Sequence, residues 1–488
     1  MTHVQATLTP RAQTSAAAPS PILPSLSARA ARAEAVHAEL SPLLGTGLST
    51  NAAIREQHGR GEGLSDLHPP ELVAFPESTG EVAMIVRACN AHAMPIIPFG
   101  VGTSLEGHVC APFGGLSLDL SRMDKVLEIN AESLDCKVQA GVTRIGLNAE
   151  LKSLGLFFPL DPGANATLGG MAATRASGTN AVRYGTMREV TLGLTVVTPS
   201  GEIVHTGGRA RKSSAGYDLT RIYVGSEGTL GVITELQVRV FGVPETISSA
   251  ICQFPDVDSA VRTVMLALQI GIPMARIELV DHLAMKGAAI YSKLTDLAPL
   301  PTLFLEFHGG PAAVAEQIAT LREIADDFGG SAFRFAEREE DRTRLWKARH
   351  DAYYSGRTLA PGCESIVSDA CVPISELADC LAACYAAAET SGLICPVVGH
   401  VGDGNFHMMA MFDPNDPAAR ARAETLMQQV SMIAQNHGGT CTGEHGVGMH
   451  KLDAMRHEHG EALSVMWAIK HALDPKGLMN PGKTLPTL

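Results

Sequence analysis

Two histidines flank a short turn in the segment Gly399-His-Val-Gly-Asp-Gly-Asn-Phe-His407. The neighbouring segments 396–398 and 406–411 are apolar and strand-like, and Asp403-Gly404 is a strong signal for a two-residue hairpin loop. With that loop, His400 faces His407 directly across the hairpin, where opposed Cβ atoms lie about 4.5–5.5 Å apart. Two imidazoles at that separation can bind one metal ion.

A third ligand is available in Gly443-Glu444-His445-Gly446. Two histidines and one carboxylate suit a divalent ion that keeps open coordination positions. Zinc or manganese is the expected ion, and ferrous iron is also compatible with these ligand types. Without a metal, the same residues would be two polar side chains at a hairpin end and a solvated glutamate.

Three loops in the first half of the chain are rich in glycine and other small residues. They are Gly100–Gly107, Pro162–Gly170 with its continuation to Gly178, and Gly225–Gly231. Such loops present consecutive backbone N–H groups to an anion, and the first loop adds the hydroxyls of Thr103 and Ser104. Three of them within about 135 residues indicate a long, flat ligand that carries phosphate, and a dinucleotide such as FAD has that shape.

The first loop differs from the NAD-binding fingerprint. Gly107 stands at the wrong spacing for G-x-G-x-x-G, and residues 111–115 (Ala-Pro-Phe-Gly-Gly) intervene where a helix should begin. Asp119 does lie roughly where a ribose-binding acid would be. The spacing nevertheless argues against NAD.

These segments resemble the flavin-binding domain of the vanillyl-alcohol-oxidase/PCMH family, from about residue 50 to the end of the chain. The similarity is greatest to its FAD-linked D-2-hydroxyacid dehydrogenases, a group that includes the cytochrome-type D-lactate dehydrogenases, the glycolate oxidase flavin subunit and the D-2-hydroxyglutarate dehydrogenases. The terminal Asn480-Pro-Gly-Lys483 resembles that family's closing motif, whose Asn reaches the flavin ring. The resemblance implies non-covalent FAD held by Pro98, Gly100, Gly102, Thr103, Ser104, Gly107, His108, Pro162, Gly163, Gly169, Gly170, Ala173, Ser177, Gly178, Glu227, Gly228, Gly231, Ile233 and Asn480.

The same resemblance assigns roles to the histidine and glutamate residues. It gives the metal to His400, His407 and Glu444, and the substrate proton to His445. The expected reaction is oxidation of a short D-2-hydroxy acid to the 2-oxo acid: the metal stabilises the developing alkoxide, His445 acts as the base, and flavin N5 accepts the hydride. Redox-neutral chemistry of the alkyl-glycerone-phosphate-synthase kind is a weaker alternative, because it needs no metal.

The substrate carboxylate requires a cation in a protein this acidic. Arg349, in Trp346-Lys-Ala-Arg-His-Asp-Ala-Tyr353, is the candidate, because a guanidinium holds a carboxylate through two parallel hydrogen bonds. Tyr353 is predicted one helical turn further on and on the same helix face. The alternative is a solvated helix arginine in a salt bridge.

Two positions bear on the choice of hydroxy acid. The D-2-hydroxyglutarate enzymes use a Lys at the position that Val367 occupies here, and an Asn at the position of Met409. An unpaired second carboxylate in such an apolar pocket would be costly. The sequence therefore favours a short monocarboxylic acid, D-lactate first and glycolate next.

The predicted fold is α+β: a PCMH-type FAD-binding domain of two subdomains, an α+β (ferredoxin-like) cap domain and a C-terminal helical segment. The expected boundaries are 1–48 for a tail and helix, 49–245 for the FAD-binding domain, 246–420 for the substrate domain with the metal hairpin, and 421–488 for helices that return to the flavin. In the cap, strands near 248–254, 302–308, 331–336, 366–372, 394–400 and 406–412 and helices near 257–270, 312–328 and 374–392 predict a sheet with helices on one face.

Composition limits the partners. The formal net charge of −13 and the 5% aromatic content argue against nucleic-acid binding, and no apolar run reaches the roughly 18 residues of a membrane span. The ten cysteines include no C-x-x-C pair, so electrons are expected to leave through a separate acceptor such as cytochrome c or a quinone. The first 33 residues contain no Asp or Glu. They fit either a disordered bacterial N-terminus or a mitochondrial transit peptide. The first alternative predicts a cytoplasmic protein, with peripheral contact at the inner membrane left open. The second predicts a mitochondrial protein. A homodimer also stays open.

Overall fold

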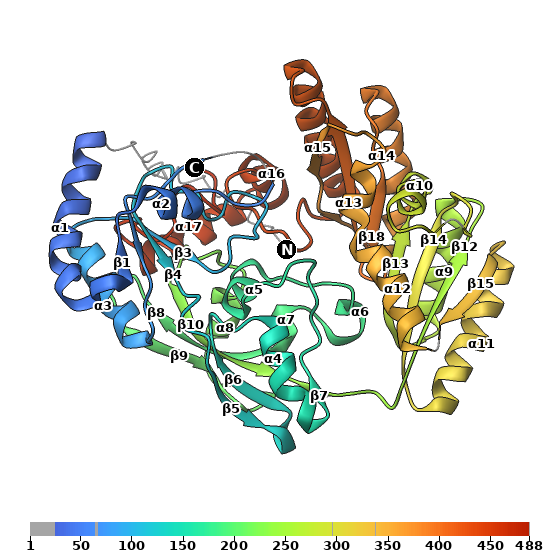
Figure 1. Cartoon of the computed structure of the whole chain (residues 1–488), viewed down its shortest axis with the longest axis horizontal. Coiled ribbons are helices and arrows are strands. Elements are labelled where there is room, and N and C mark those ends of the chain that lie inside the picture. The colour runs from blue at the N-terminus through green and yellow to red at the C-terminus, as the bar shows by residue number, and fades with distance from the viewer. Residues whose placement is uncertain (1–24, 64–66, 295, 337, 488) are drawn as a thin grey trace, which may run out of the picture.

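The computed structural model describes residues 25–63, 67–294, 296–336 and 338–487 of the 488-residue chain. Two bodies lie side by side (Figure 1): a blue-to-green body formed by residues up to about 242, and a second body formed by residues from about 246 to 436. Each has its own apolar core. The acid-poor N-terminal segment lies largely outside the described residues. No helix among the described residues is both long and apolar enough to cross a membrane.

The first body combines two sheets. In the smaller one the strand order is β1 (Leu48–Ser49), β2 (Leu72–Ala74), β4 (Leu116–Asp119) and β3 (Ile96–Phe99), with β2, β4 and β3 parallel. The larger sheet is antiparallel, in the order β5 (Val126–Asn130), β6 (Asp135–Gln139), β10 (Val232–Arg239), β8 (Thr191–Val197) and β9 (Ile203–Gly207). A two-stranded ribbon joins β7 (Leu156–Phe157) to β11 (Phe241–Gly242). The helices are α1 (Leu26–Leu44), α2 (Ala52–His58), α3 (Thr79–Ala91), α4 (Arg144–Leu151), α5 (Leu168–Thr174), α6 (Ala181–Tyr184), α7 (Met187–Val190) and α8 (Leu219–Tyr223). This is the predicted PCMH-type architecture of two subdomains.

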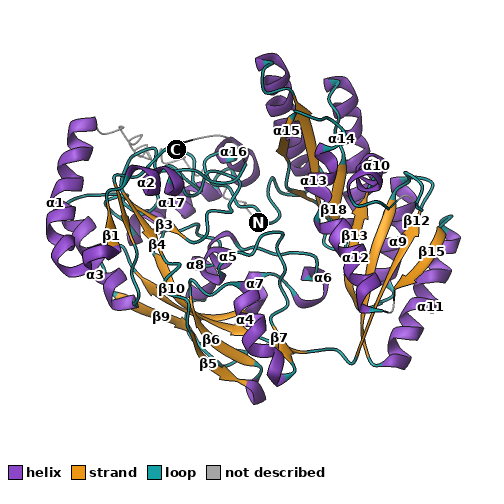
Figure 2. Ribbon diagram, in the orientation of Figure 1, coloured by secondary structure: helices purple, strands orange, loops and turns teal. Residues whose placement is uncertain are grey.

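The second body is one antiparallel sheet (Figure 2). Its order is β15 (Ser331–Ala336), β12 (Thr246–Gln253), β14 (Thr302–Gly309), β13 (Met274–Val280), β18 (Val397–His400), β19 (Asn405–Phe412) and β16 (Glu364–Val367), and β17 (Ala370–Cys371) also pairs with β19. The predicted strand 366–372 is thus split in two, and β13 was not predicted at all.

Helices cover both faces of this sheet, so the prediction of helices on one face was wrong. Successive residues of a strand point to opposite faces, and Ala250 and Cys252 belong to one core while Ile251 belongs to another. The first core is covered by α9 (Val257–Gln269), α11 (Pro311–Asp327), α14 (Leu377–Ser391) and α15 (Pro417–Asn436); the second is covered by α10 (His282–Tyr291), α12 (Glu339–His350) and α13 (Ala352–Arg357).

The C-terminal segment returns to the first body. Helices α16 (Leu452–His459) and α17 (Ala462–Leu473) lie beside it in Figure 1, and the buried Lys470 of α17 donates to the carbonyl of Thr229 at 2.6 Å. Helix α15 instead contributes to the core of the second body. The expected boundary at residue 420 falls inside this helix, because the return begins after residue 436.

Polar contacts hold the two bodies together. Arg276 of β13 forms an ion pair with Asp161 at 3.1 Å and donates to Asn180 at 3.0 Å, and the Tyr184 hydroxyl lies 2.8 Å from His308. These contacts fix β13 and β14 against the first body.

Candidate functional site

The hairpin that carries the two histidines has a four-residue loop and not the predicted two-residue loop. His400 is paired with Asn405, and His407 is paired with Val398. Residues 401–404 form the turn, in which Asp403 N–H donates to the His400 carbonyl. The register therefore shifts by two residues, and a shift of two keeps both histidines on one face. They become diagonal neighbours, with ring centroids 5.4 Å apart.

The three predicted metal ligands converge on one point. Glu444 Oε1 lies 3.3 Å from His400 Nε2 and 3.4 Å from His407 Nε2. The opposite nitrogens are occupied, because His400 Nδ1 contacts Glu278 at 2.7 Å and His407 Nδ1 contacts the Ser368 carbonyl at 3.1 Å. Acceptors at both Nδ1 atoms leave the Nε2 lone pairs free for a metal. The donor set therefore fits a divalent ion.

The electrostatics of the cluster also favour a cation. Burial opposes protonation of His400, but Glu278 and Glu444 on its two sides outweigh burial and raise its pKa well above the ordinary value. A proton or a metal ion is thus stabilised between these groups. In the same way, burial is outweighed by His400 and His407, which hold the pKa of Glu444 well below its ordinary range.

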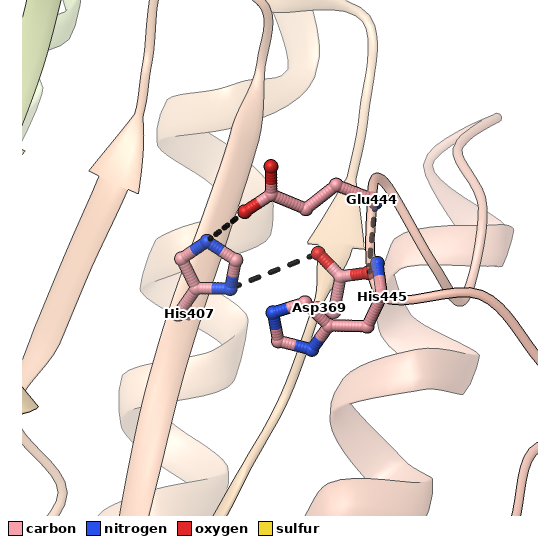
Figure 3. Close-up of side chains that lie close together, drawn as sticks. All are labelled: Asp369, His407, Glu444 and His445. Atoms are coloured by element: carbon pink, nitrogen blue, oxygen red, sulfur yellow. Dashed lines mark hydrogen bonds and ion pairs between the residues drawn. The ribbon is translucent and has the colours of Figure 1, made fainter. Parts of the chain in front are cut away.

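Asp369, which was not predicted as a site residue from the sequence, holds the loop of Glu444 and His445 in place (Figure 3). Its Oδ2 accepts hydrogen bonds from the backbone N–H groups of Glu444 at 2.9 Å and His445 at 2.7 Å, and from the Thr442 hydroxyl at 2.7 Å. Its Oδ1 accepts from Asn405 Nδ2 at 3.0 Å. Asp369, His407, Glu444 and His445 could also be grouped as metal ligands. Since both oxygens of Asp369 are already occupied, we assign this carboxylate to support of the loop.

His445 lies beside the cluster with its ring stacked on that of His407, at 5.1 Å between centroids and 8° between planes. Its Nδ1 is buried without a hydrogen bond and lies 3.9 Å from Glu106 of the first glycine loop. Burial lowers the pKa of His445, and His407 and Lys451 lower it further, although Asp369 opposes them. A neutral imidazole is the form that can accept a proton.

Arg349 reaches the site, whereas Tyr353 is placed differently from the prediction. The Arg349 side chain is buried at the end of α12 and donates through Nη2 to Glu278 at 2.5 Å, and its Nε is buried without a hydrogen bond. The helix ends at His350, and Tyr353 lies in the separate helix α13. The expectation of one continuous helix face was therefore wrong. The Tyr353 hydroxyl is 3.4 Å from Ser365, and its side chain is partly exposed.

The three glycine loops meet next to the cluster. A Cβ at Gly100 would lie 2.5 Å from the Thr167 hydroxyl of the second loop, and one at Gly228 would lie 2.9 Å from Pro98. Glu227 of the third loop accepts from the backbone of Val447 at 2.7 Å and Gly448 at 2.8 Å. The flavin-type loops and the Glu444-His445 loop are therefore one connected unit.

Family profiles identify both halves of this unit. Residues 70–207 match the FAD binding domain, and residues 243–484 match the C-terminal domain of FAD linked oxidases. The chain is 48% identical over 464 residues to a probable mitochondrial D-lactate dehydrogenase of Danio rerio, an alignment that covers 94% of this chain and 93% of that protein. The chain belongs to the FAD-linked oxidase family. The resemblance to FAD-linked D-2-hydroxyacid dehydrogenases is thereby confirmed.

Other relatives and solved structures agree with this assignment. The chain is 43% identical to the mitochondrial D-lactate dehydrogenase [cytochrome] of Arabidopsis thaliana, over 92% of this chain and 79% of that one, and 35% identical to the glycolate oxidase subunit GlcD of Bacillus subtilis, over 85% and 88%. The structure of p-cresol methylhydroxylase with substrate bound superposes with a TM-score of 0.79, at 17% identity, over 95% of this chain and 98% of that one. An alkyldihydroxyacetonephosphate synthase superposes at 0.73, with 22% identity over 91% and 85%. At these identities the structures establish the fold alone.

Two of the cofactor residues predicted for this FAD-linked oxidase, Ser104 and Gly163, have an unused donor or open space that a bound dinucleotide could use. The Ser104 hydroxyl is buried without a partner, as expected of a donor that awaits a ligand. A cavity of about 730 Å³ borders the first loop at Val101 and the second loop at Thr167. Gly163 has open space around it.

Several other predicted cofactor residues contact protein in this FAD-linked oxidase. Gly169 packs on Ala140, Gly231 on the carbonyl of Val197, and Ser177 donates to Glu444 at 2.6 Å. Asn480, expected at the flavin ring, donates through Nδ2 to the carbonyls of Glu227 at 2.7 Å and His108 at 3.3 Å. Its Oδ1 accepts from Lys483 at 2.7 Å.

The sequence reasoning missed Glu278 and Asp369, the two buried carboxylates that hold the site in place. Both lie in short segments that mix charged and apolar residues, Arg276-Ile-Glu-Leu and Ser368-Asp-Ala-Cys. A charge inside an otherwise apolar strand is the signal that could have identified them, because such a charge is buried only with a partner.

Proposed function

We propose that this enzyme oxidises a short D-2-hydroxy acid, D-lactate first, to the corresponding 2-oxo acid. The observation that carries the proposal is the convergence of His400, His407, Glu444 and His445 beside Arg349, next to loops that fit FAD. The curated relatives named D-lactate dehydrogenase support the choice of substrate.

Each group has a role that follows from its environment. Arg349 binds the substrate carboxylate through guanidinium donors that Glu278 leaves unpaired. His445, whose pKa is lowered chiefly by burial, takes the hydroxyl proton. A divalent ion on His400, His407 and Glu444, zinc or manganese, would supply charge stabilisation to the substrate oxygen. Bound FAD would supply the acceptor for the hydride.

The face of β19 that carries His407 also supports a small substrate. Met409 follows two residues later on that face, and Val367 of β16 is paired with it. Across from them, α13 packs so closely that a Cβ at Gly356 would lie 2.7 Å from the Met409 terminal methyl. These groups offer no partner to a second carboxylate. Glycolate, the substrate named for the Bacillus subtilis relative, is the second candidate because it is also small and monocarboxylic.

Relatives also suggest the electron acceptor and the location. Those from Arabidopsis thaliana and Saccharomyces cerevisiae are named mitochondrial cytochrome-type enzymes. We therefore propose cytochrome c as the acceptor, with a quinone as the alternative, and mitochondrial targeting as the role of the acid-poor N-terminus.

An anaerobic substrate panel tests the proposal. The FAD-loaded enzyme is mixed with D-lactate, L-lactate, glycolate and D-2-hydroxyglutarate, and bleaching of the flavin absorbance is followed. D-lactate should bleach the flavin fastest and L-lactate should not bleach it. An equal response to both enantiomers would refute the stereochemical claim, and a preference for D-2-hydroxyglutarate would refute the pocket argument.

A further inference from the structure

Glu278 lies in the middle of β13 and connects the two halves of the candidate site. Its carboxylate is completely buried. Oε1 contacts His400 Nδ1 at 2.7 Å, and Oε2 accepts from Arg349 Nη2 at 2.5 Å. One side chain therefore contacts both a proposed metal ligand and the proposed carboxylate-binding arginine.

The pairing of β13 with β18 determines where this carboxylate lies. Leu279 is paired with Gly399 of β18, so Glu278 lies one step further along the ladder, beside His400. Two residues earlier on the same face, Arg276 forms an ion pair with Asp161 of the flavin-binding body at 3.1 Å. The strand that carries Glu278 is thus fixed to the body that holds the flavin loops.

We propose that Glu278 is a positioning residue that sets the separation between the metal and the substrate-binding guanidinium. This inference rests on the proposed function. The hydroxyl and carboxylate of a 2-hydroxy acid are on adjacent carbons, so a metal that binds one and an arginine that binds the other must keep a fixed spacing. A carboxylate that accepts from both His400 and Arg349 provides that spacing, and it also fixes the imidazole tautomer whose Nε2 faces the metal.

The positioning role gives a function to a buried charge. Burial of an ion pair adds little stability over apolar packing of similar volume, so fold stability alone does not account for a glutamate at this position. Glutamine at this position would have the same shape, but its NH₂ group would meet a donor from either His400 or Arg349. Only an ionised carboxylate accepts from both.

The test is Glu278→Gln, compared with Glu306→Gln as a matched control. Glu306 is also a buried glutamate, on the adjacent β14, and it contacts an arginine and a histidine, Arg276 at 3.5 Å and His308 at 2.9 Å. These partners belong to the contact between the two bodies and not to the metal cluster. Both variants lose one buried negative charge, so a purely structural effect should appear in both.

Two constants are measured on FAD-loaded protein: the Mn²⁺ dissociation constant of the metal-stripped enzyme, and KM for D-lactate at saturating Mn²⁺. Glu278→Gln should raise both about tenfold or more, as loss of an outer partner of a metal-bound histidine does, while Glu306→Gln leaves the Mn²⁺ constant within twofold. A change in only one constant, or in neither, for Glu278→Gln overturns the bridging role. If this variant does not retain FAD, Glu278→Asp is measured instead, and its shorter carboxylate should raise both constants in the same direction.

The controls separate the two proposals. If the wild-type enzyme binds Mn²⁺ and is bleached by D-lactate but Glu278→Gln behaves like it, the positioning role alone fails. If the wild-type enzyme neither binds the metal nor is bleached by any hydroxy acid, the proposed function itself fails.

Discussion

Asp369→Asn is the substitution for which the contacts allow the most detailed prediction. The side chain has almost no exposed surface, and its two oxygens accept four hydrogen bonds. Two of the donors are the backbone N–H groups of Glu444 and His445, so this carboxylate directly fixes the proposed metal ligand and base. Burial opposes its ionisation, but the neighbouring side chains of His445, Lys451 and His407 outweigh burial and hold the pKa of Asp369 well below its ordinary range.

The cost of the change follows from what an amide can still accept. With its oxygen toward Thr442, Glu444 and His445, the asparagine keeps three hydrogen bonds, each weakened by roughly 1 kcal/mol because the acceptor is no longer charged. Its NH₂ group then faces the Asn405 NH₂ group, which leaves a buried donor unsatisfied at a cost of about 1–3 kcal/mol. The Asn405 amide cannot turn over without losing its hydrogen bond to the Ala370 carbonyl. Together these losses amount to roughly 4–6 kcal/mol.

If only a third of that free energy is lost from metal binding by Glu444, the metal dissociation constant rises about tenfold. We expect Asp369→Asn to retain FAD but to lose metal affinity by tenfold or more and turnover with D-lactate by more than that. Asp281→Asn is the control: Asp281 is equally buried, caps α10 through Ala284 N–H and accepts from the Tyr385 hydroxyl. Burial raises the pKa of Asp281 to about 6, so its negative charge is less strongly stabilised than that of Asp369. Unchanged metal affinity in Asp369→Asn, together with a lower unfolding temperature, would show that the carboxylate supports only the fold.

Three further predictions concern separate parts of the site. His400→Ala should lose bound metal and turnover while the flavin absorbance is kept, because the ion-pair partners of His400 are Glu278 and Glu444. Metal analysis and the visible spectrum of the same sample check this, and full metal content would contradict it. Arg349→Lys should raise KM for D-lactate about tenfold, since an ammonium group loses the paired geometry of the guanidinium, and an unchanged KM would exclude Arg349 from the site. Lys483, whose pKa burial lowers to about 7, binds one proton less in the folded state between that pH and its unfolded pKa of 10.5. Its contribution to stability therefore rises with pH in that window, so the unfolding midpoint of the wild type should increase between pH 7 and 9 relative to Lys483→Met; a constant difference would contradict the buried position.

The sequence identified which residues form the site more accurately than it predicted how those residues are arranged. The hairpin loop was predicted with two residues and has four, yet the two histidines still share a face, because the error was an even number of residues. A register error of one residue would have separated them. Tyr353 shows the opposite case, since a single break at Asp351 placed it in another helix and removed the predicted shared face with Arg349.

What the sequence could not indicate is the set of buried carboxylates that joins distant segments. Glu278 contacts residues 71 and 122 positions away, and Asp369 contacts residues 75 and 76 positions away. Local periodicity reports which face of an element is apolar, and it treats a lone charge as a solvated residue or as the end of a strand. The interruption between β16 and β17 falls at Ser368 and Asp369. There Asp369 accepts from the loop at 442–445, while Ser368 accepts from Met408 of β19. The hydrogen-bond partner that makes such an interruption favourable lies far away in the sequence and is found only in the folded chain. Charged residues within apolar runs are therefore the positions at which a sequence-based description of a site most needs the structure.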